Sequence, residues 1–324
     1  MLGDYSVLIT KQLNTDNIQN SIMSNVLFQN ITSKTIKKYD QQGYTGADLH
    51  FHTEFSMDAI SKVENILHLA KKKNIGFAVT DHNQIGGALK AVKLKKQKKQ
   101  DTLVIPAVEA TCKEGAHLIY YFYDAAELQE WYKKELEPHM KHNPFFAAVP
   151  TVELIDNSTK YNAVLCTPHP FAPGVTGFCK EKHEKKTLKK IDVVEVMNAF
   201  NIHNLNKKAV DWAKQLNKGF TAGSDGHTTP ELGTALTFAH GDSIEEFLTS
   251  LKKRESIAVG NEESLFHKAV ISLLKEETYI KKAKEHHEAF RLIESQYGTE
   301  AMYLKKKEDH ERSALLHYFR IHHW

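Results

Sequence analysis

The sequence predicts an α/β fold in which βα units surround a parallel sheet or barrel. From Ala47 onward, short β-prone runs alternate with helical stretches, a rhythm typical of βα units. Histidines and carboxylates recur where these runs end. Residues 261–324 change to long helical periodicity without further strand signals.

Seven runs rich in β-branched and aromatic residues are predicted to be strands: 47–52, 75–80, 103–109, 117–123, 162–167, 191–197 and 219–224. Segment 61–73 is predicted to be a helix, with Ser61 as its N-cap and an apolar face packed on the sheet. The lysine-rich run 93–100 is interpreted as the solvated end of another helix rather than a nucleic-acid patch.

The chain is expected to have three parts. Residues 1–46 are polar and weakly patterned, and Ile22, Val26 and Leu27 indicate one amphipathic helix within an N-terminal extension. Residues 47–260 carry the strand and helix alternation. Residues 261–324 are predicted to be a helical C-terminal appendage, and its histidine pairs, His286-His287 and His322-His323, are excluded from the site because no carboxylates at strand ends accompany them.

Composition limits the classes of function. The 43 basic and 40 acidic residues leave a net charge of +3, so strong sequence-independent binding to nucleic acid is not expected. No apolar run approaches the roughly 20 residues that span a bilayer, and no signal peptide is recognised. Three cysteines without CxxC spacing suggest neither disulfides nor a thiolate zinc site, and they favour a cytoplasmic location.

The first two candidate groups follow predicted strands. In DLHFHTEFSMD, His50 and His52 lie two residues apart, so strand alternation puts both imidazoles on one face, and Asp58 lies just beyond. In GFAVTDHNQ, a β-prone run ends in Thr80, Asp81 and His82, so a strand end again delivers an imidazole. Asp81 is either a carboxylate that orients a ligand or a helix N-cap.

The remaining candidates follow later strands. Glu109 ends an apolar run, and a buried carboxylate there needs a cation or hydrogen-bond donors. His117 opens the next strand and His169 follows another. In AGSDGH, Asp225 and His227 again lie two residues apart, like His50 and His52. In VVEVMN, Glu195 is a further acid that could either support the ligands or serve only in packing. Because active sites of parallel α/β folds lie at the carboxyl ends of strands, convergence is expected.

These motifs, from about Ala47 to about Ala239, resemble the PHP (polymerase and histidinol phosphatase) superfamily of metal-dependent phosphoesterases. The segments that carry the resemblance are HFHTEFSMD, TDHN, IPAVEA, HLIYYF, TPHPF, VVEVMN and AGSDGH. The resemblance implies a distorted (β/α)7 barrel that holds two or three divalent metal ions. Mixed nitrogen and oxygen ligands suit Zn, Mn or Fe.

The resemblance also implies a ligand set. A first metal would be held by His50, His52, Glu109 and Asp225; Glu109 would bridge to a second metal bound by His117 and His169; a third would take Asp58, His82 and His227. Many relatives have histidine at the position of Asp58. A metal-bound water, with Asp225, Glu109 and His227, would carry catalysis, while Asp81 and Glu195 would support the ligands. Only four arginines are present, so the basic residues Lys180, Lys182 and His183 are proposed to contact substrate, although a solvated loop is the alternative.

The expected function is hydrolysis of phosphate esters, with a nucleotide or short single-stranded oligonucleotide as substrate. A phosphatase of a small metabolite resembling histidinol phosphate is the main alternative. A non-catalytic domain that binds metal or nucleic acid, and an amidohydrolase, which also opens with a His-x-His pair, are the others. No membrane partner is expected, and the sequence gives no oligomeric state.

Overall fold

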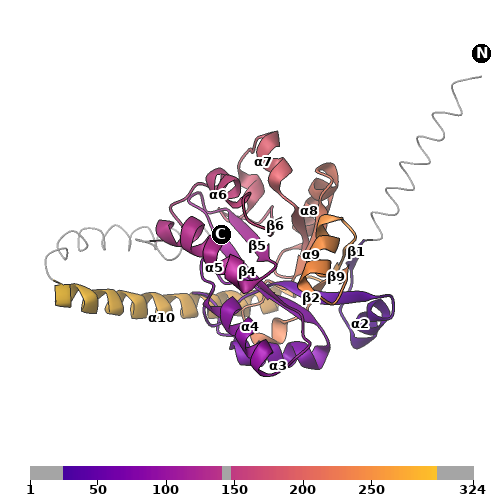
Figure 1. Cartoon of the computed structure of the whole chain (residues 1–324), viewed down its shortest axis with the longest axis horizontal. Helices are drawn as coiled ribbons and strands as arrows, with labels where there is room; N and C mark the ends of the chain where they lie inside the picture. Colours follow the sequence, from indigo (N-terminus) through magenta and orange to yellow (C-terminus); the bar gives the residue numbers. More distant parts are fainter. Residues whose placement is uncertain (1–24, 141–146, 298–324) are drawn as a thin grey trace, which may run out of the picture.

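Ten strands of the computed structural model form one curled sheet, and the structure describes residues 25–140 and 147–297, with side chains to Lys282. Figure 1 shows the strands at the centre with helices around them. In chain order the strands are β1 (Val26–Phe28), β2 (Tyr44–Phe51), β3 (Gly76–Val79), β4 (Val104–Thr111), β5 (His117–Phe122), β6 (Ala163–Thr167), β7 (Val193–Asn198), β8 (Gly219–Gly223), β9 (Ala235–His240) and β10 (Ile257–Gly260). Their order across the sheet is β1-β10-β9-β2-β3-β4-β5-β6-β7-β8.

Helices pack against this sheet, with α4 on β4, α8 on β7 and α9 on β9. The α-helices are α2 (Ser33–Asp40), α3 (Val63–Lys73), α4 (Gly86–Gln97), α5 (Ala125–Trp131), α6 (Thr151–Ser158), α7 (Lys185–Lys190), α8 (His203–Gln215), α9 (Ile244–Lys252) and α10 (Leu265–Tyr297). Short π or 3-10 turns occupy η1 (Tyr132–Leu136), η2 (Glu137–His139), η3 (Phe178–Lys180) and η4 (Thr229–Glu231). Within the described ranges, no helix is both long enough and apolar enough to cross a bilayer.

The predicted α/β class and distorted seven-stranded barrel are confirmed. Strands β2 to β8 are consecutive neighbours, and the chain just after β8 returns to β2. There the Asp225 amide donates to the His50 carbonyl at 2.8 Å, and the His52 amide donates to the Gly226 carbonyl at 2.9 Å. Strand β5 is antiparallel to both β4 and β6, which is the main departure from a regular parallel barrel.

Strand alternation separates two apolar layers. On β4, Val104 and Val108 belong to the larger apolar cluster, whereas Ile105 and Ala107 belong to a second cluster, to which α9 contributes Phe247, Leu248 and Leu251. Successive side chains point to opposite faces, so Glu109 continues the inner row. Apolar packing along the strand therefore aims this carboxylate into the barrel.

The structure corrects two local expectations. Val26 and Leu27 lie in strand β1, which pairs with β10, rather than in an amphipathic helix. Ile22 lies outside the described residues. Helix α3 begins at Val63 with Lys62 at its N-cap, because the Ser61 hydroxyl donates instead to the His227 carbonyl at 3.1 Å.

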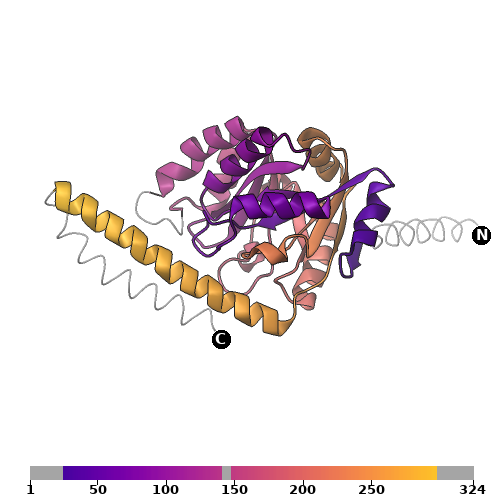
Figure 2. The same cartoon turned by 90° about the horizontal axis from the view of Figure 1, so that it is seen from below.

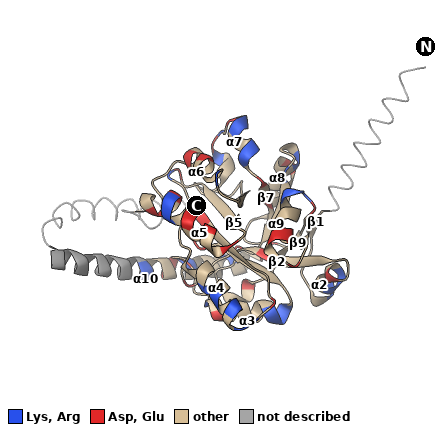
Figure 3. Cartoon of the chain, in the orientation of Figure 1, with Lys and Arg blue, Asp and Glu red and all other residues tan. Residues whose placement is uncertain are grey.

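Lysine and arginine are spread over several helices, among them α2, α3, α4 and α7, rather than gathered on one element (Figure 3). The lysine-rich run after residue 93 lies at the end of α4, and Lys96, Lys98 and Lys99 are exposed there. This observation confirms the interpretation of the run as a solvated helix end.

Gly223→Ala should lower the free energy of unfolding by about 1–3 kcal/mol, because a side chain at this point overpacks the barrel seam. A Cβ on Gly223 would lie 2.3 Å from the His50 Cβ and 2.7 Å from the His50 amide nitrogen. Urea unfolding of parent and variant measures the difference. A change below about 0.5 kcal/mol would show that the seam tolerates a methyl group.

Candidate metal centre

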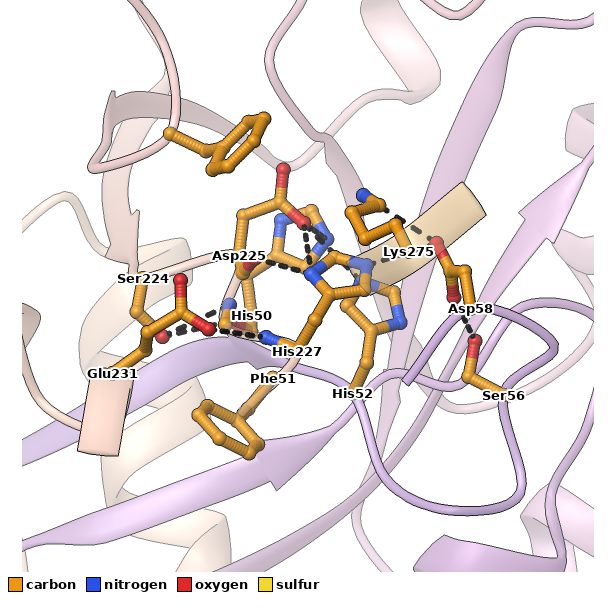
Figure 4. A network of polar contacts seen from close by, with 12 residues as sticks. His50, Phe51, His52, Ser56, Asp58, Ser224, Asp225, His227, Glu231 and Lys275 are labelled. Atoms are coloured by element: carbon orange, nitrogen blue, oxygen red, sulfur yellow. Dashed lines mark hydrogen bonds and ion pairs between the residues drawn. The ribbon is translucent and has the colours of Figure 1, made fainter. Parts of the chain in front are cut away.

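The nine predicted metal ligands lie together at one end of the barrel. Four overlapping groups have candidate ligand atoms within 4.8 Å of one another: His50, His52 and Glu109; His50, His169 and Asp225; His82, Glu109 and His117; and His52, Asp58, His82 and His227. Figure 4 shows the part of this cluster around His52 and Asp225. Residues from distant parts of the chain thus form one continuous set of donors.

Glu109 lies at the centre of the cluster and is fully buried. Its Oε1 is 2.9 Å from His117 Nδ1 and 3.2 Å from His169 Nε2. Its Oε2 is 3.4 Å from His50 Nε2, 3.5 Å from His52 Nε2 and 3.1 Å from His82 Nδ1. The two oxygens face different imidazoles, which is the geometry that a bridging carboxylate requires.

His117 joins the cluster because β5 runs antiparallel to its neighbours. The first residue of β5 therefore lies beside the last residues of β4, and His117 pairs in register with Thr111. Ile119 and Tyr121 lie in the inner apolar cluster, and alternation directs His117 the same way.

Several donor atoms in the cluster are buried without a hydrogen-bond partner among the described residues. They are His50 Nε2, both ring nitrogens of His52, His82 Nδ1, Glu109 Oε2, His117 Nδ1 and His169 Nδ1. Leaving so many polar atoms unpaired in a protein interior is costly. Imidazole nitrogens and carboxylate oxygens are ligands of divalent transition metals, so these residues fit such ions.

Glu195 supports the cluster from β7. Its Oε1 accepts a hydrogen bond from His50 Nδ1 at 2.9 Å, and its Oε2 accepts from the His169 backbone amide at 2.7 Å. A carboxylate behind an imidazole fixes the ring and leaves the other nitrogen available for a metal. Asn198, which the sequence did not single out, donates to Glu195 Oε2 at 3.0 Å and to Asp225 Oδ2 at 3.2 Å.

The hydrogen bonds around His227 fix its tautomer. Its Nδ1 lies 2.7 Å from the Asp225 backbone carbonyl, which can only accept, so Nδ1 carries the proton. The opposite nitrogen, Nε2, lies 2.9 Å from Asp58 Oδ2. Two lone pairs face each other there unless a proton or a metal cation lies between them. Glu231, also missed in the sequence, accepts from the His227 amide at 3.0 Å.

Backbone strain accompanies two of the candidate ligands. His169 has a φ of 26° and Asp225 a φ of 53°, both in the left-handed region that non-glycine residues rarely adopt. Such conformations persist where surrounding structure holds them, and they concentrate at functional sites.

The carboxylates and imidazoles of the buried cluster shift one another's pKa values. Burial opposes ionisation of Glu109, but the charges of His117, His50 and His82 hold its pKa well below the usual range. Burial likewise opposes ionisation of Asp225, whose pKa is nevertheless lowered by His50 and Lys275 among its neighbours. Burial, reinforced by the nearby His227 charge, lowers the pKa of His52 to about 3. Burial lowers the pKa of His50 as well, but the charges of Glu195, Asp225 and Glu109 raise it well above the usual range.

Asp81 supports the loop after β2. Its carboxylate accepts from the Thr53 amide at 2.5 Å and from the Thr53 hydroxyl at 2.7 Å. It does not cap α4, whose N-cap is Ile85. Thr53 directly follows His52, so Asp81 acts on a ligand through the backbone next to it. Burial raises the pKa of Asp81 to about 7.

The three candidate substrate contacts lie in the segment around η3 and α7. Lys180 and Lys182 are exposed. The His183 ring stacks on Phe178 at 3.9 Å between centroids, and its Nε2 is 2.9 Å from the Phe178 carbonyl. Their role in binding substrate remains a prediction.

Helix α10 reaches the cluster, which the sequence reading did not anticipate. Lys275 Nζ lies 3.4 Å from Asp58 Oδ2, and Figure 4 shows it directed at that carboxylate from the helix. His267 Nε2 lies 3.2 Å from Glu231 Oε1. The side chains of His286 and His287, and all of His322 and His323, lie outside the described part of the chain.

A separate cavity of about 470 Å³ lies at the opposite, amino ends of the strands. Its lining includes Ile36, Tyr44, Lys71, Lys99 and Asp242. It contains none of the candidate ligands.

Comparison with known proteins connects this arrangement to a family. The family model described as PHP-associated matches residues 203–256. The uncharacterized protein MJ1587 of Methanocaldococcus jannaschii is 30% identical over 166 residues, which cover 48% of this chain and 82% of that protein. The chain belongs to the PHP superfamily.

Solved structures share the PHP fold. A two-domain protein from Bacteroides vulgatus, which contains a predicted PHP-like metal-dependent phosphoesterase, has a TM-score of 0.51 and 16% identity over 68% of this chain and 66% of its own. The lesion-specific endonuclease PfuEndoQ from Pyrococcus furiosus has a TM-score of 0.51 and 19% identity, over 66% of this chain and 57% of its own. Endonuclease Q in complex with a 27-mer duplex bearing an abasic lesion has a TM-score of 0.53 and 17% identity, over 68% of this chain and 60% of its own. The PHP chain therefore spans less than two thirds of both endonuclease Q chains and about two thirds of the first structure.

Glu195→Gln should weaken metal binding about 10- to 100-fold, because the amide removes the negative charge behind His50. Metal titration followed by calorimetry measures this change. Glu262→Gln is the matched control, since Glu262 forms a similar pair with His203 (3.0 Å) away from the cluster. Equal metal affinity in the Glu195 variant and the parent would contradict the supporting role.

Proposed function

We propose that this PHP protein hydrolyses phosphate esters with divalent metal ions held by the nine clustered side chains. One observation carries the proposal: Glu109 presents its two oxygens to different groups of imidazoles, within a buried set of otherwise unpartnered donors. We further propose that residues 47–260 form the phosphoesterase barrel that carries these nine side chains.

Divalent ions at such a site would lower the pKa of a bound water and attract phosphoryl oxygens. The chain's own residues prepare for this chemistry. Glu195 holds His50 with Nε2 turned inward, and the Asp225 carbonyl does the same for His227. Asn198 restrains the Asp225 carboxylate, whose Oδ1 lies 3.3 Å from His52 Nε2. Glu109, Asp225 and His227 are thus our candidates for catalysis.

The donor set favours two or three ions of Zn, Mn or Fe. Imidazole nitrogen suits these metals better than Ca, which prefers oxygen ligands alone. We propose a first ion near His50, His52 and Asp225, a second near His117 and His169, and a third near Asp58, His82 and His227, with Glu109 shared. The third position matches one compact group of donors, and His117 and His169 both approach Glu109 Oε1, at 2.9 and 3.2 Å. The other groups divide differently, since His169 lies with His50 and Asp225, and His117 with His82 and Glu109. His82 also approaches Glu109, at 3.1 Å, so it could serve two positions.

A nucleotide or a short oligonucleotide is the proposed substrate. The endonuclease Q structures, one of them in complex with a DNA duplex, are consistent with this choice, but their similarity concerns the fold and covers 57% and 60% of those chains. A phosphatase of a small metabolite is the second candidate. Its support is the near-balance of 43 basic and 40 acidic residues, which leaves a net charge of only +3 for binding a polyanion.

Asp225→Ala should abolish turnover and deplete bound metal, because the change removes a carboxylate whose Oδ1 lies 3.6 Å from His50 Nε2 and 3.3 Å from His52 Nε2. Activity is measured with Zn, Mn and Fe on mononucleotides, nucleoside bisphosphates, 5′-phosphorylated oligonucleotides and histidinol phosphate. Metal content is measured beside it by mass spectrometry. A loss of at least about a thousandfold in kcat/KM is expected if metal chemistry carries the reaction.

Asp242→Ala is the matched control, since Asp242 accepts from the Thr45 hydroxyl at 2.8 Å at the other end of the barrel. Near-normal turnover of the Asp225 variant would contradict the assignment. A parent protein that binds metal and cleaves none of the esters would instead support a non-catalytic domain. Cleavage of amides but not phosphate esters would favour an amidohydrolase.

A further inference from the structure

We propose that Lys275, on the C-terminal helix α10, binds the phosphoryl group of the substrate, so that this helix completes the active site. The inference rests on the proposed hydrolysis of phosphate esters and names a residue that recognises the phosphoryl group. Figure 2 shows α10 running along one side of the barrel domain and extending beyond it.

Three lysines of α10 are spaced seven residues apart: Lys268, Lys275 and Lys282. Two turns of helix separate successive members, so all three lie on one face, about 10 Å apart. Each contacts the barrel domain. Lys268 donates to the Asn201 carbonyl at 2.7 Å, and Lys282 donates to carbonyls of the loop after β2. This row is the face by which α10 is attached.

The outer two lysines hold the helix in place. Lys282 Nζ lies 2.8 Å from the Glu54 carbonyl and 2.9 Å from the Ala59 carbonyl, and it also donates to the Ser56 carbonyl. These acceptors surround Asp58 in sequence. Ile271, on the same side of the helix, is only 3% exposed. The position of Lys275 is therefore fixed on both sides.

Lys275 lies between this anchored helix and the metal cluster. Its ammonium is 3.4 Å from Asp58 Oδ2 and 5.3 Å from the centre of the Phe200 ring. The side chain is 26% exposed, whereas Asp58 is 12% exposed. Lys275 thus stands at the solvent side of the cluster, where a substrate would enter.

Metal binding would change what Lys275 can pair with. The Asp58 carboxylate would then be occupied by a cation, and the ammonium would face positive charge. An anion that lies between metal and lysine relieves this repulsion, and a phosphoryl oxygen is such an anion. The same position that gives an ion pair with Asp58 therefore gives a phosphate contact in the loaded site.

Two other basic residues, Arg254 and Lys90, are less suitable because other groups already engage them. Arg254 donates to the Asn217 carbonyl at 3.3 Å, beyond the amino end of β8. Lys90 is engaged by Glu54 and Glu64 at 2.7 and 3.0 Å. Lys275 approaches a candidate metal ligand directly. In the alternative role, Lys275 only holds α10 against the barrel through Asp58. Replacing Lys275 would then destabilise the protein without weakening phosphate binding.

Lys275→Met should raise KM and the dissociation constant for inorganic phosphate about 10- to 100-fold in the metal-loaded protein, because a charge-assisted hydrogen bond is lost. The value of kcat should stay within about threefold, since binding is lost equally in ground and transition states. Lys275→Arg should recover most of the phosphate affinity. Calorimetry with inorganic phosphate, metal analysis and steady-state kinetics provide the measurements.

Lys281→Met is the matched control on the same helix, because Lys281 is exposed. Unchanged phosphate affinity in the Met variant would overturn the proposal, as would weaker binding that is fully explained by lower metal content. A lower melting temperature of the Met variant with unchanged phosphate binding would indicate a purely structural role for Lys275, and this result would also overturn the proposal. If the parent cleaves no ester, the proposed hydrolysis fails, whereas the phosphate titration still tests Lys275.

Discussion

The buried charge of Glu109 is the interaction on which the rest of the site depends. A fully buried carboxylate near the end of β4 needs cations or hydrogen-bond donors at its oxygens. The barrel meets this need with imidazoles from other strands: His117 and His169 on one side, His50, His52 and His82 on the other. Divalent ions between these donors would convert a costly arrangement into a stable one, and the same ions would provide the chemistry.

The geometry of the curled sheet supplies this convergence. Parallel strands end at a common edge, and the return of the chain from β8 to β2 brings Asp225 beside His50. Gly223 permits that return because it has no side chain, and a Cβ at this position would lie 2.3 Å from the His50 Cβ. The left-handed backbone at His169 and Asp225 shows that two donors are held in strained conformations by their surroundings.

Support for the centre extends well beyond the donors. Glu195, Asn198, Asp81 and Glu231 fix rings, carboxylates and backbone around it. Helix α10 adds to this layer from a different part of the chain, because Lys282 binds the loop that carries Asp58. The C-terminal helix is therefore a component of the site's wall as well as an addition to the barrel.

The sequence by itself predicted the fold class, the strands from β2 to β8 and the nine candidate donors, because alternation and the position of polar residues after apolar runs are local properties. Only the tertiary structure decided how these donors group. The direction of β5 brings His117 to the cluster, and it depends on pairing with β4 and β6. Lys275 reaches Asp58 because α10 docks across the barrel end, although the spacing of Lys268, Lys275 and Lys282 was visible in the sequence. Ser61 likewise bonds to His227 instead of capping α3. Contacts between residues far apart in the chain depend on packing, which local patterns do not encode.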